Sequence, residues 1–279
     1  MTTCGVQDQQ QCDDAAVRRN CGFGFTLIEL LVVVAIIALL ISILIPALSR
    51  VRRSAKLGVC RSNLGQLGVA VTVYADQNRG RMPKGPDCAG PYDFACSDYA
   101  TTQLWIGSSS EAHPNQPNGL GALLKTNFAD PRVLFCPSDD SNNLEEELPR
   151  IGSDADAYGS YTYRQLDLLP PIGKKGVLSN LGANEVGDMR IPVQALALDT
   201  NSLGPDPYRH TNHNAKKANV LYIDRSVQTF SNKRGAFTIP QETFENPLDI
   251  FTRLDQILLN ADFGYQRNPD ETPMIETEP

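Results

Sequence analysis

The sequence lacks the patterns that mark the common enzyme classes. It holds three histidines in 279 residues, and it contains no Gly-x-Ser-x-Gly elbow, no glycine-rich phosphate-binding loop and no His-Glu-x-x-His pair. No two cysteines have the Cys-x-x-Cys spacing of common zinc sites. The formal net charge is −7, so the whole chain offers no electrostatic basis for binding nucleic acid. These absences lead us to expect a protein that is not an enzyme.

Charge is nearly absent from one long stretch. Residues 25–45 form an apolar run of 21 residues in which Glu29 is the sole charged side chain. As a helix rising about 1.5 Å per residue, such a run matches the roughly 30 Å hydrocarbon core of a bilayer. The run therefore predicts a transmembrane helix over 25–45. A carboxylate inside such a helix is costly, so Glu29 needs a partner or a function.

The residues at the start of this run, Gly24-Phe25-Thr26-Leu27-Ile28-Glu29, resemble the processing site of type IV prepilins and type II secretion pseudopilins. The resemblance implies that a prepilin peptidase and methyltransferase cuts between Gly24 and Phe25 and then methylates Phe25. It also implies that Glu29, the fifth mature residue, serves filament assembly. Pro46 matches a proline that kinks the N-terminal helix in this family. The alternative is an ordinary signal anchor with a chance glutamate.

The polar first 24 residues precede the candidate cleavage site and are predicted to be a leader peptide. A secretory signal would instead be cut after its apolar region. The basic residues alone favour a cytoplasmic C-terminal side, because more of them follow the span than precede it. They are Arg50, Arg52, Arg53 and Lys56 against Arg18 and Arg19. The resemblance implies the opposite, a single-pass protein of the inner (cytoplasmic) membrane with its head on the extracytoplasmic side.

Beyond the span, residues 46–78 are predicted to continue the helix as an amphipathic segment. Apolar residues recur there at spacings of three and four, which places them on one stripe that is too short for a typical coiled coil. The stripe consists of Leu57, Cys60, Leu64, Leu67, Val71 and Tyr74. Gly58, Gly65 and Gly68 each weaken the helix by up to about 1 kcal/mol, so packing against a head must hold it. The segment Gln77-Asn78-Arg79-Gly80 is predicted to end the helix.

Residues 79–263 are predicted to form a globular head, and the acidic tail 264–279 to be disordered. Proline and glycine predict long loops with little regular structure over 83–119. Strands are predicted at 133–135, 158–164, 193–198, 219–223 and 227–230, and a helix at 248–259. The expected fold is α+β, a long N-terminal helix packed on a small antiparallel sheet with a loop-rich head.

Four cysteines follow the leader: Cys60, Cys88, Cys96 and Cys136. In an oxidising compartment an even number favours disulfides, and three pairings are possible. The short separation of Cys88 and Cys96 favours that pair. Cys60–Cys136 would then tie the helix to the sheet, and buried free thiols are the equal alternative.

The C-terminal half resembles a broad group of bacterial pilin-like proteins. They share a cysteine after the long helix, a Cys-Pro-Ser segment, and a late histidine before an Asn-Val-Leu-aromatic-x-Asp-Gly hairpin. The counterparts here are Cys60, Cys136-Pro137-Ser138, His213 and 219–224. Arg225 stands where the group has glycine, so the motif does not predict a type I′ turn.

Type II secretion pseudopilins often bind calcium in a C-terminal loop, which would here suit the oxygen ligands of Asp199 and Asp206. The alternative is a polar loop that caps turns, and no other cofactor is expected.

The sequence thus favours a non-enzymatic pseudopilin or minor pilin of a type II secretion or type IV pilus-like filament. Its expected partners are the peptidase, other pilin-like subunits and the inner-membrane assembly machinery. The alternative is a membrane-anchored extracytoplasmic binding domain that does not polymerise.

Overall fold

The computed structural model describes residues 26–86, 100–108, 113–125, 128–165, 183–186, 189–206 and 208–264. The predicted leader, the residues Gly24 and Phe25, the Cys88–Cys96 pair and the tail from 265 therefore lie outside the described residues. The chain divides into two compact units between Ser49 and Arg50, a division that falls inside the first helix rather than at its end.

The helices and strands follow one another through the head in a mixed order. The α-helices are α1 (Leu27–Gln77), α2 (Gly121–Lys125), α3 (Leu144–Glu147) and α4 (Pro247–Gly264). The strands are β1 (Ala100–Ile106), β2 (Gln116–Pro117), β3 (Ala157–Arg164), β4 (Ala183–Val186), β5 (Met189–Pro192), β6 (Ala195–Leu198), β7 (Asn201–Ser202), β8 (Lys217–Tyr222), β9 (Val227–Ser231) and β10 (Thr238–Ile239). The 3-10 helices are η1 (Pro131–Leu134), η2 (Leu148–Arg150), η3 (His213–Ala215), η4 (Lys233–Gly235) and η5 (Gln241–Glu245).

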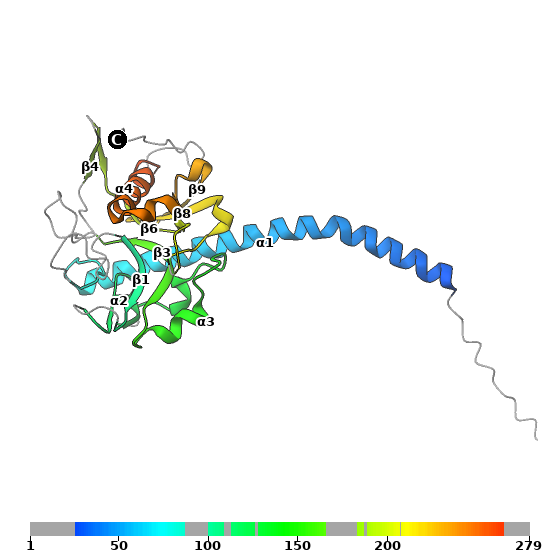
Figure 1. Ribbon diagram of the computed structural model, residues 1–279, viewed down its shortest axis with the longest axis horizontal. Helices are drawn as coiled ribbons and strands as arrows, with labels where there is room; N and C mark the ends of the chain where they lie inside the picture. Colours follow the sequence, from blue (N-terminus) through cyan, green and yellow to red (C-terminus); the bar gives the residue numbers. More distant parts are fainter. Residues whose placement is uncertain are drawn as a thin grey trace, which may run out of the picture. The chain divides into compact units, whose positions relative to one another are not determined.

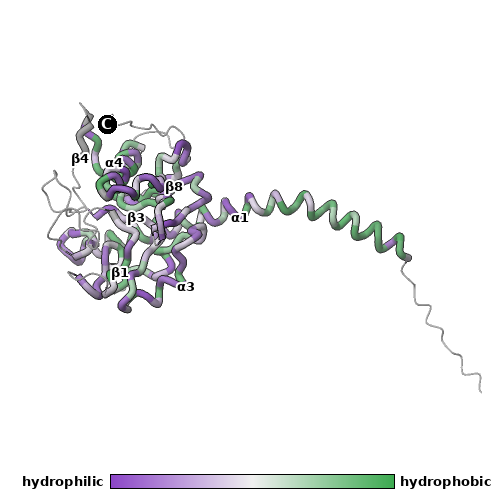
Figure 2. The backbone as a smooth tube through the Cα atoms, viewed as in Figure 1, coloured by the Kyte–Doolittle hydropathy of each residue, from purple (hydrophilic) through white to green (hydrophobic). Residues whose placement is uncertain are grey.

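Helix α1 is a single helix of 51 residues, as the sequence predicted. Up to Ser49 its side chains are exposed and almost all apolar. Figure 2 shows this part of the helix as mostly green. The helix ends where the sequence predicted, because Arg79 and Gly80 adopt left-handed backbone with φ of 59° and 79°. The Gly80 N–H donates to the carbonyl of Ala75 at 2.7 Å, which satisfies a carbonyl of the last turn.

The head is built on a six-stranded sheet in the order β2-β1-β3-β6-β8-β9, and every neighbouring pair in it is antiparallel (Figure 1). The predicted strands at 158–164, 193–198, 219–223 and 227–230 correspond to β3, β6, β8 and β9. Two smaller sheets pair β4 with β5 and β7 with β10. The α+β prediction is therefore confirmed.

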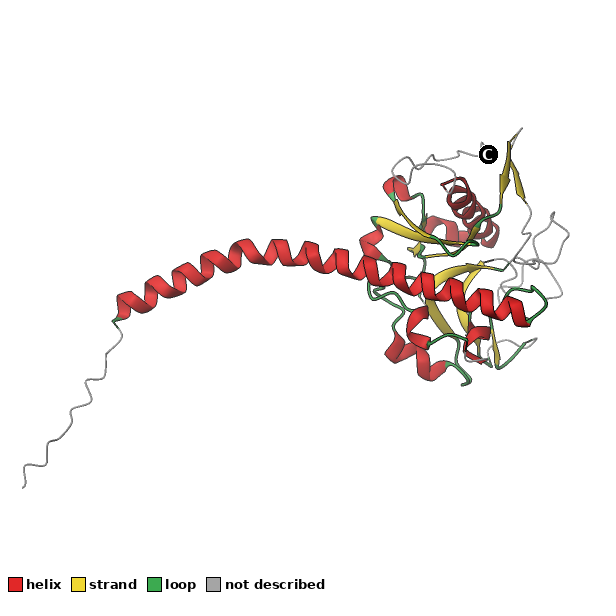
Figure 3. Ribbon diagram, turned by 180° about the vertical axis from the view of Figure 1, so that it is seen from behind, coloured by secondary structure: helices red, strands yellow, loops and turns green. Residues whose placement is uncertain are grey.

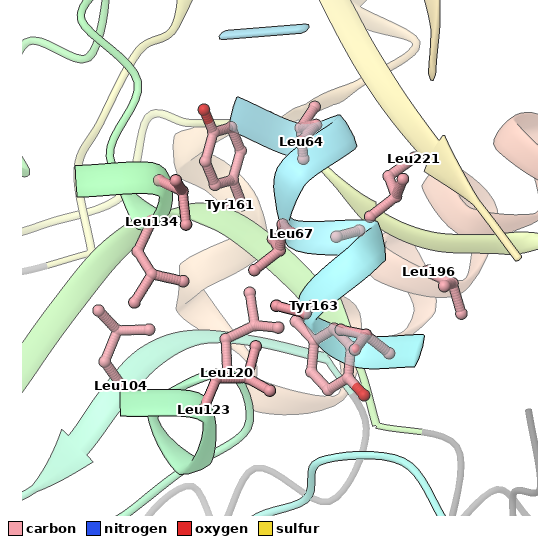
Figure 4. Packing of buried hydrophobic residues seen from close by; sticks show 14 of the residues in the cluster. Leu64, Leu67, Leu104, Leu120, Leu123, Leu134, Tyr161, Tyr163, Leu196 and Leu221 are labelled. Carbon is pink, nitrogen blue, oxygen red and sulfur yellow. The ribbon is translucent and has the colours of Figure 1, made fainter. Parts of the chain in front are cut away.

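The two faces of the sheet are covered by different helices (Figures 1 and 3). The predicted stripe of α1 packs on one face, where Leu64 and Leu67 join Tyr161 of β3 and Leu221 of β8 (Figure 4). Helix α4 covers the other face, packing residues such as Ile257 on the alternate residues of β8. Because β8 side chains alternate between the faces, both helices depend on this strand.

Two predictions about the head are wrong. Residues 133–135 were expected to be a strand, but 131–134 form η1, because Asp130 caps its start and Pro131 suits its first turn. The Asp130 carboxylate accepts the Arg132 N–H at 2.9 Å. The region 83–119 was expected to be long loops with little regular structure, yet it supplies β1 and β2 of the main sheet, since β1 pairs with β3 and buries Leu104.

Tyr222 and Ser226 close the β8–β9 hairpin, and the chain turns through residues 223–225 between them. Of these three residues Arg225 alone has a positive φ, at 68°. The Arg225 N–H donates to the Tyr222 carbonyl at 2.9 Å, and the Tyr222 N–H donates to the Ser226 carbonyl at 3.0 Å. This is a turn followed by a left-handed residue rather than a type I′ turn. Gly68 of α1 lies against this hairpin, since a Cβ there would be 2.9 Å from Leu221 Cδ1.

Candidate functional site

A buried cluster of polar and sulfur-containing side chains lies where α1 meets the head. Cys60 of α1 and Cys136, which follows η1, form a disulfide across 76 residues, with Cα atoms 5.2 Å apart. A closed loop of this size stabilises a fold by about 4 kcal/mol in the chain-entropy account. The disulfide ties the helix to the head, the arrangement that the sequence favoured for this pair.

His213 and Asp199 lie beside the disulfide. The Nε2 of His213 is 3.0 Å from Asp199 Oδ2 and 3.6 Å from Cys136 Sγ. Asn219 of β8 also binds the carboxylate, since its Nδ2 donates to Asp199 Oδ2 at 2.7 Å and its backbone N–H donates to Oδ1. One ligand atom from each of Cys60, Cys136, Asp199 and His213 lies within 4.8 Å of the others.

Asp199 is fully buried, and its burial raises the pKa of the carboxyl group above the ordinary value of 3.8. The hydrogen bond and charge of His213 oppose that shift, as do the two Asn219 donors, because they favour the ionised form. Burial outweighs them. The site is therefore a low-dielectric pocket in which a negative charge needs positive partners.

The backbone that presents His213 is strained. His213, Asn214 and Ala215 have φ of 52°, 55° and 53°, a run of three non-glycine residues in the left-handed region. Such conformations cost of order 1–3 kcal/mol each and persist where the surroundings hold them. Here Asn212 anchors the turn, with Nδ2 donating to the carbonyls of Ser160 and Thr200. The anchored turn places the imidazole of His213 against Asp199.

The second aspartate expected to bind calcium is not part of this group. Asp206 is exposed, whereas Asp199 is buried with His213 and the two cysteines. The sequence places His213 in the pilin-like motif of the C-terminal half, but it does not predict that His213 lies beside both Cys60 and Cys136. The three residues are far apart in the sequence, so only the packing of α1 on the sheet brings them together.

The start of α1 forms a second candidate site. The backbone N–H and the hydroxyl of Thr26 both donate to Glu29 Oε2, at 2.9 and 2.8 Å. The Glu29 N–H in turn donates to Thr26 Oγ1 at 3.2 Å. This reciprocal pair is a capping box, with Thr26 at the N-cap and Glu29 three residues later. The Thr-x-x-Glu pattern was present in the sequence as a signal for it.

A comparison with known protein families finds the prokaryotic N-terminal methylation motif at residues 19–45, which include the capping box. The chain carries a prepilin-type segment. This is the cleavage and methylation segment of type IV pilin-like proteins, which are structural subunits rather than enzymes. No curated protein and no solved structure matches the chain.

The prepilin-type segment continues into an apolar helix suited to anchor the chain in a membrane. Among the described residues, α1 is the helix long and apolar enough to cross a bilayer, with a mean hydropathy of 3.2 over its most apolar window. None of the residues in this most apolar stretch of α1 is buried within the protein. Pro46 lies inside this helix and has no N–H for the carbonyl of Ser42.

Proposed function

We propose that the chain is a processed filament subunit, a pseudopilin or minor pilin of a type II secretion or type IV pilus-like system. In this proposal the peptidase cuts between Gly24 and Phe25, and Phe25 is methylated. The observation that carries it is the match of the prepilin-type segment at the start of a long helix. The second half of that helix is built into the core of the head.

The exposed apolar surface of α1 supports assembly. Ile37 and Leu44 in the first unit expose 49% and 61% of their surface. Within the head unit, Val69 and Val73 still expose 50% and 40%, on the side of the helix that the sheet does not cover. A lipid bilayer accounts for the first set but not for the second. Packing against the helices of other subunits would cover both sets.

Glu29 would act through its charge. In a filament its carboxylate can meet the positive amine of Phe25 in a neighbouring subunit, where a low dielectric strengthens the pair. Such a pair would fix the axial register, and the break in hydrogen bonding at Pro46 would let the helix adapt to its neighbours. The subunit would lie in the inner membrane with its head outside, served by the assembly machinery there.

The capping box offers a competing role for Glu29, and one substitution separates the two. Glutamine also completes a capping box, but it carries no charge. We therefore expect Glu29→Gln and Glu29→Val to lower the fraction of the chain in sheared or cross-linked multimers to a similar extent. Glu29→Asp should be intermediate, since the charge remains but its reach is shorter. Cleavage and melting of the head should match the parent in all three.

Wild-type multimer levels in Glu29→Gln, with loss in Glu29→Val, would assign the carboxylate to helix capping instead. Equal multimers in all the variants would favour the alternative, a membrane-anchored binding domain that does not polymerise.

Processing is tested separately by intact mass and N-terminal sequencing from membranes. We expect a mature chain that begins with methylated Phe25, and Gly24→Ala should largely abolish the cleavage. A different first residue would contradict the proposed cut.

A further inference from the structure

The cluster around the disulfide has the composition of a metal site. It offers two cysteine sulfurs, one imidazole nitrogen and one carboxylate oxygen within 4.8 Å of one another. Two thiolates, a histidine and a fourth ligand in tetrahedral arrangement are the set that zinc prefers, with metal–ligand distances of about 2.0–2.3 Å. The cysteines are bonded to each other, so disulfide and metal would exclude one another.

We propose that reduction of the Cys60–Cys136 disulfide creates a zinc site from these two cysteines with His213 and Asp199. The proposal goes beyond filament assembly and does not depend on it. A dithiol reductant gives two electrons to the disulfide and becomes a disulfide itself, leaving two thiols in the protein. Zn²⁺ then displaces to solvent one proton from each thiol and the proton held between His213 and Asp199, and it binds the two thiolates. Asp199 supplies an oxygen and His213 its Nε2.

The geometry of His213 suits this role. Its Nε2 is the atom that faces both Asp199 and Cys136, so the imidazole needs no rotation to reach a metal placed among them. In the disulfide form a single proton shared between Nε2 and Asp199 Oδ2 accounts for their 3.0 Å contact. A metal would take the place of that proton, and it would supply the positive partner that a buried Asp199 carboxylate needs.

Groups outside the four ligands already support a thiolate and a carboxylate. The Ser138 N–H points to Cys136 Sγ at 3.4 Å, within the Cys136-Pro137-Ser138 turn, and such N–H donors stabilise charge on sulfur. Asn219 binds the Asp199 carboxylate with both its side chain and its backbone. Partners of this kind orient metal ligands and typically change metal affinity by about 10–100-fold.

The test uses the full chain in detergent, with Cys4, Cys12, Cys21, Cys88 and Cys96 replaced by serine. One sample is left oxidised, and the other is reduced with a dithiol and desalted without oxygen. Both are titrated with Co²⁺, whose absorption reports thiolate ligands, and then with Zn²⁺. We expect one Co²⁺ per reduced chain, displaced by one Zn²⁺. Binding to the oxidised chain should be more than about 100-fold weaker, since the thiolates are missing.

Variants then assign the ligands. His213→Gln and Asp199→Asn should each weaken Co²⁺ binding by at least about tenfold, and Asn219→Ala by a similar factor through Asp199. Asp206→Asn is the matched control and should bind like the parent. Melting of the oxidised variants checks that each is folded. Absence of thiolate–cobalt absorption in the reduced parent would overturn the proposal. So would equal affinity in the parent and in folded His213→Gln and Asp199→Asn, because the cysteines alone would then hold the metal.

Discussion

The two units of the chain differ in the side chains that they expose and bury: the first exposes apolar side chains, and the head buries some charged ones. Up to Ser49, α1 exposes leucine, isoleucine and valine along its whole length, and Leu27 and Ile28 expose 77% and 73% of their surface. In the head, charged side chains are buried instead, and Arg164 and Asp262 expose 1% each. The first unit is suited to an apolar solvent outside the protein. The head supplies an ionic partner for this buried guanidinium in the carboxylate of Asp262.

Within α1 the two kinds of surface meet in one continuous helix. The first half shows an uninterrupted apolar run, whereas the second half shows a stripe with polar residues between its members. Apart from Glu29, the run does not single out one face of the helix, since every side of it is apolar. The stripe specifies one face, and that face packs on the sheet. The predictions below test this contrast, from the largest expected effect to the smallest.

The stripe and the opposite side of the same helix should respond differently to charge. Leu67 is fully buried, so Leu67→Asp should lower the free energy of unfolding by more than about 4 kcal/mol. Val69 is two residues away and half exposed, so Val69→Asp should change it by less than about 0.5 kcal/mol. Urea unfolding in detergent, followed by the fluorescence of the single tryptophan, Trp105, measures both. Similar losses in the two variants would contradict the packing of the stripe.

Burial of the Arg164 charge in the head should depend on its ion pair with Asp262. Arg164 Nη1 lies 2.7 Å from Asp262 Oδ2, and Asp262 Oδ1 accepts the N–H groups of Gln194 and Ala195 at 2.8 and 2.7 Å. Asp262→Ala leaves a buried guanidinium unpaired and should cost about 3–5 kcal/mol in urea unfolding. The exposed Asp206→Ala is the control and should cost little. A small loss in Asp262→Ala would show that water reaches Arg164.

The sequence predicted the elements whose pattern is local and long. The apolar run, the stripe, the strands β3, β6, β8 and β9 and the helix α4 each show their pattern over several neighbouring residues, so the sequence alone reveals it. The prediction from the sequence was wrong at η1, where three apolar residues fit either a strand or a turn. There the capping side chain of Asp130 favours the 3-10 helix. The sequence also missed the group of Cys60, Asp199 and His213, because these residues meet only after the sheet has formed. The sequence did not predict the ion pair of Arg164 with Asp262 for the same reason.

A buried glutamate should make the stability of the head depend on pH. Burial raises the pKa of Glu147 above its ordinary 4.5, although the Tyr158 N–H and the Arg150 guanidinium favour its ionised form. The folded chain therefore holds this proton more tightly than the unfolded chain. Stability falls as pH rises from about 4.5 through the raised pKa.

Glu147→Gln removes that titration, so its deficit relative to the parent should be largest below pH 4.5 and shrink as pH rises. Urea unfolding across this range measures the deficit, and Glu145→Gln, at an exposed position of the same helix, is the matched control. A deficit for Glu147→Gln that stays constant with pH would contradict the raised pKa.

The smallest predicted effect separates two glycines on the same helix. A Cβ added at Gly65 meets no atom within 4 Å, so Gly65→Ala should gain the helix propensity of alanine, about 0.5–1 kcal/mol. A Cβ at Gly68 would lie 2.9 Å from Leu221 Cδ1 and 3.5 Å from Arg225 Cβ. Gly68→Ala must shift the end of the Leu221 side chain, so its gain should be smaller or reversed. Paired urea titrations resolve the difference between the two variants, and equal gains would mean that α1 and the β8–β9 hairpin are not in close contact at this point.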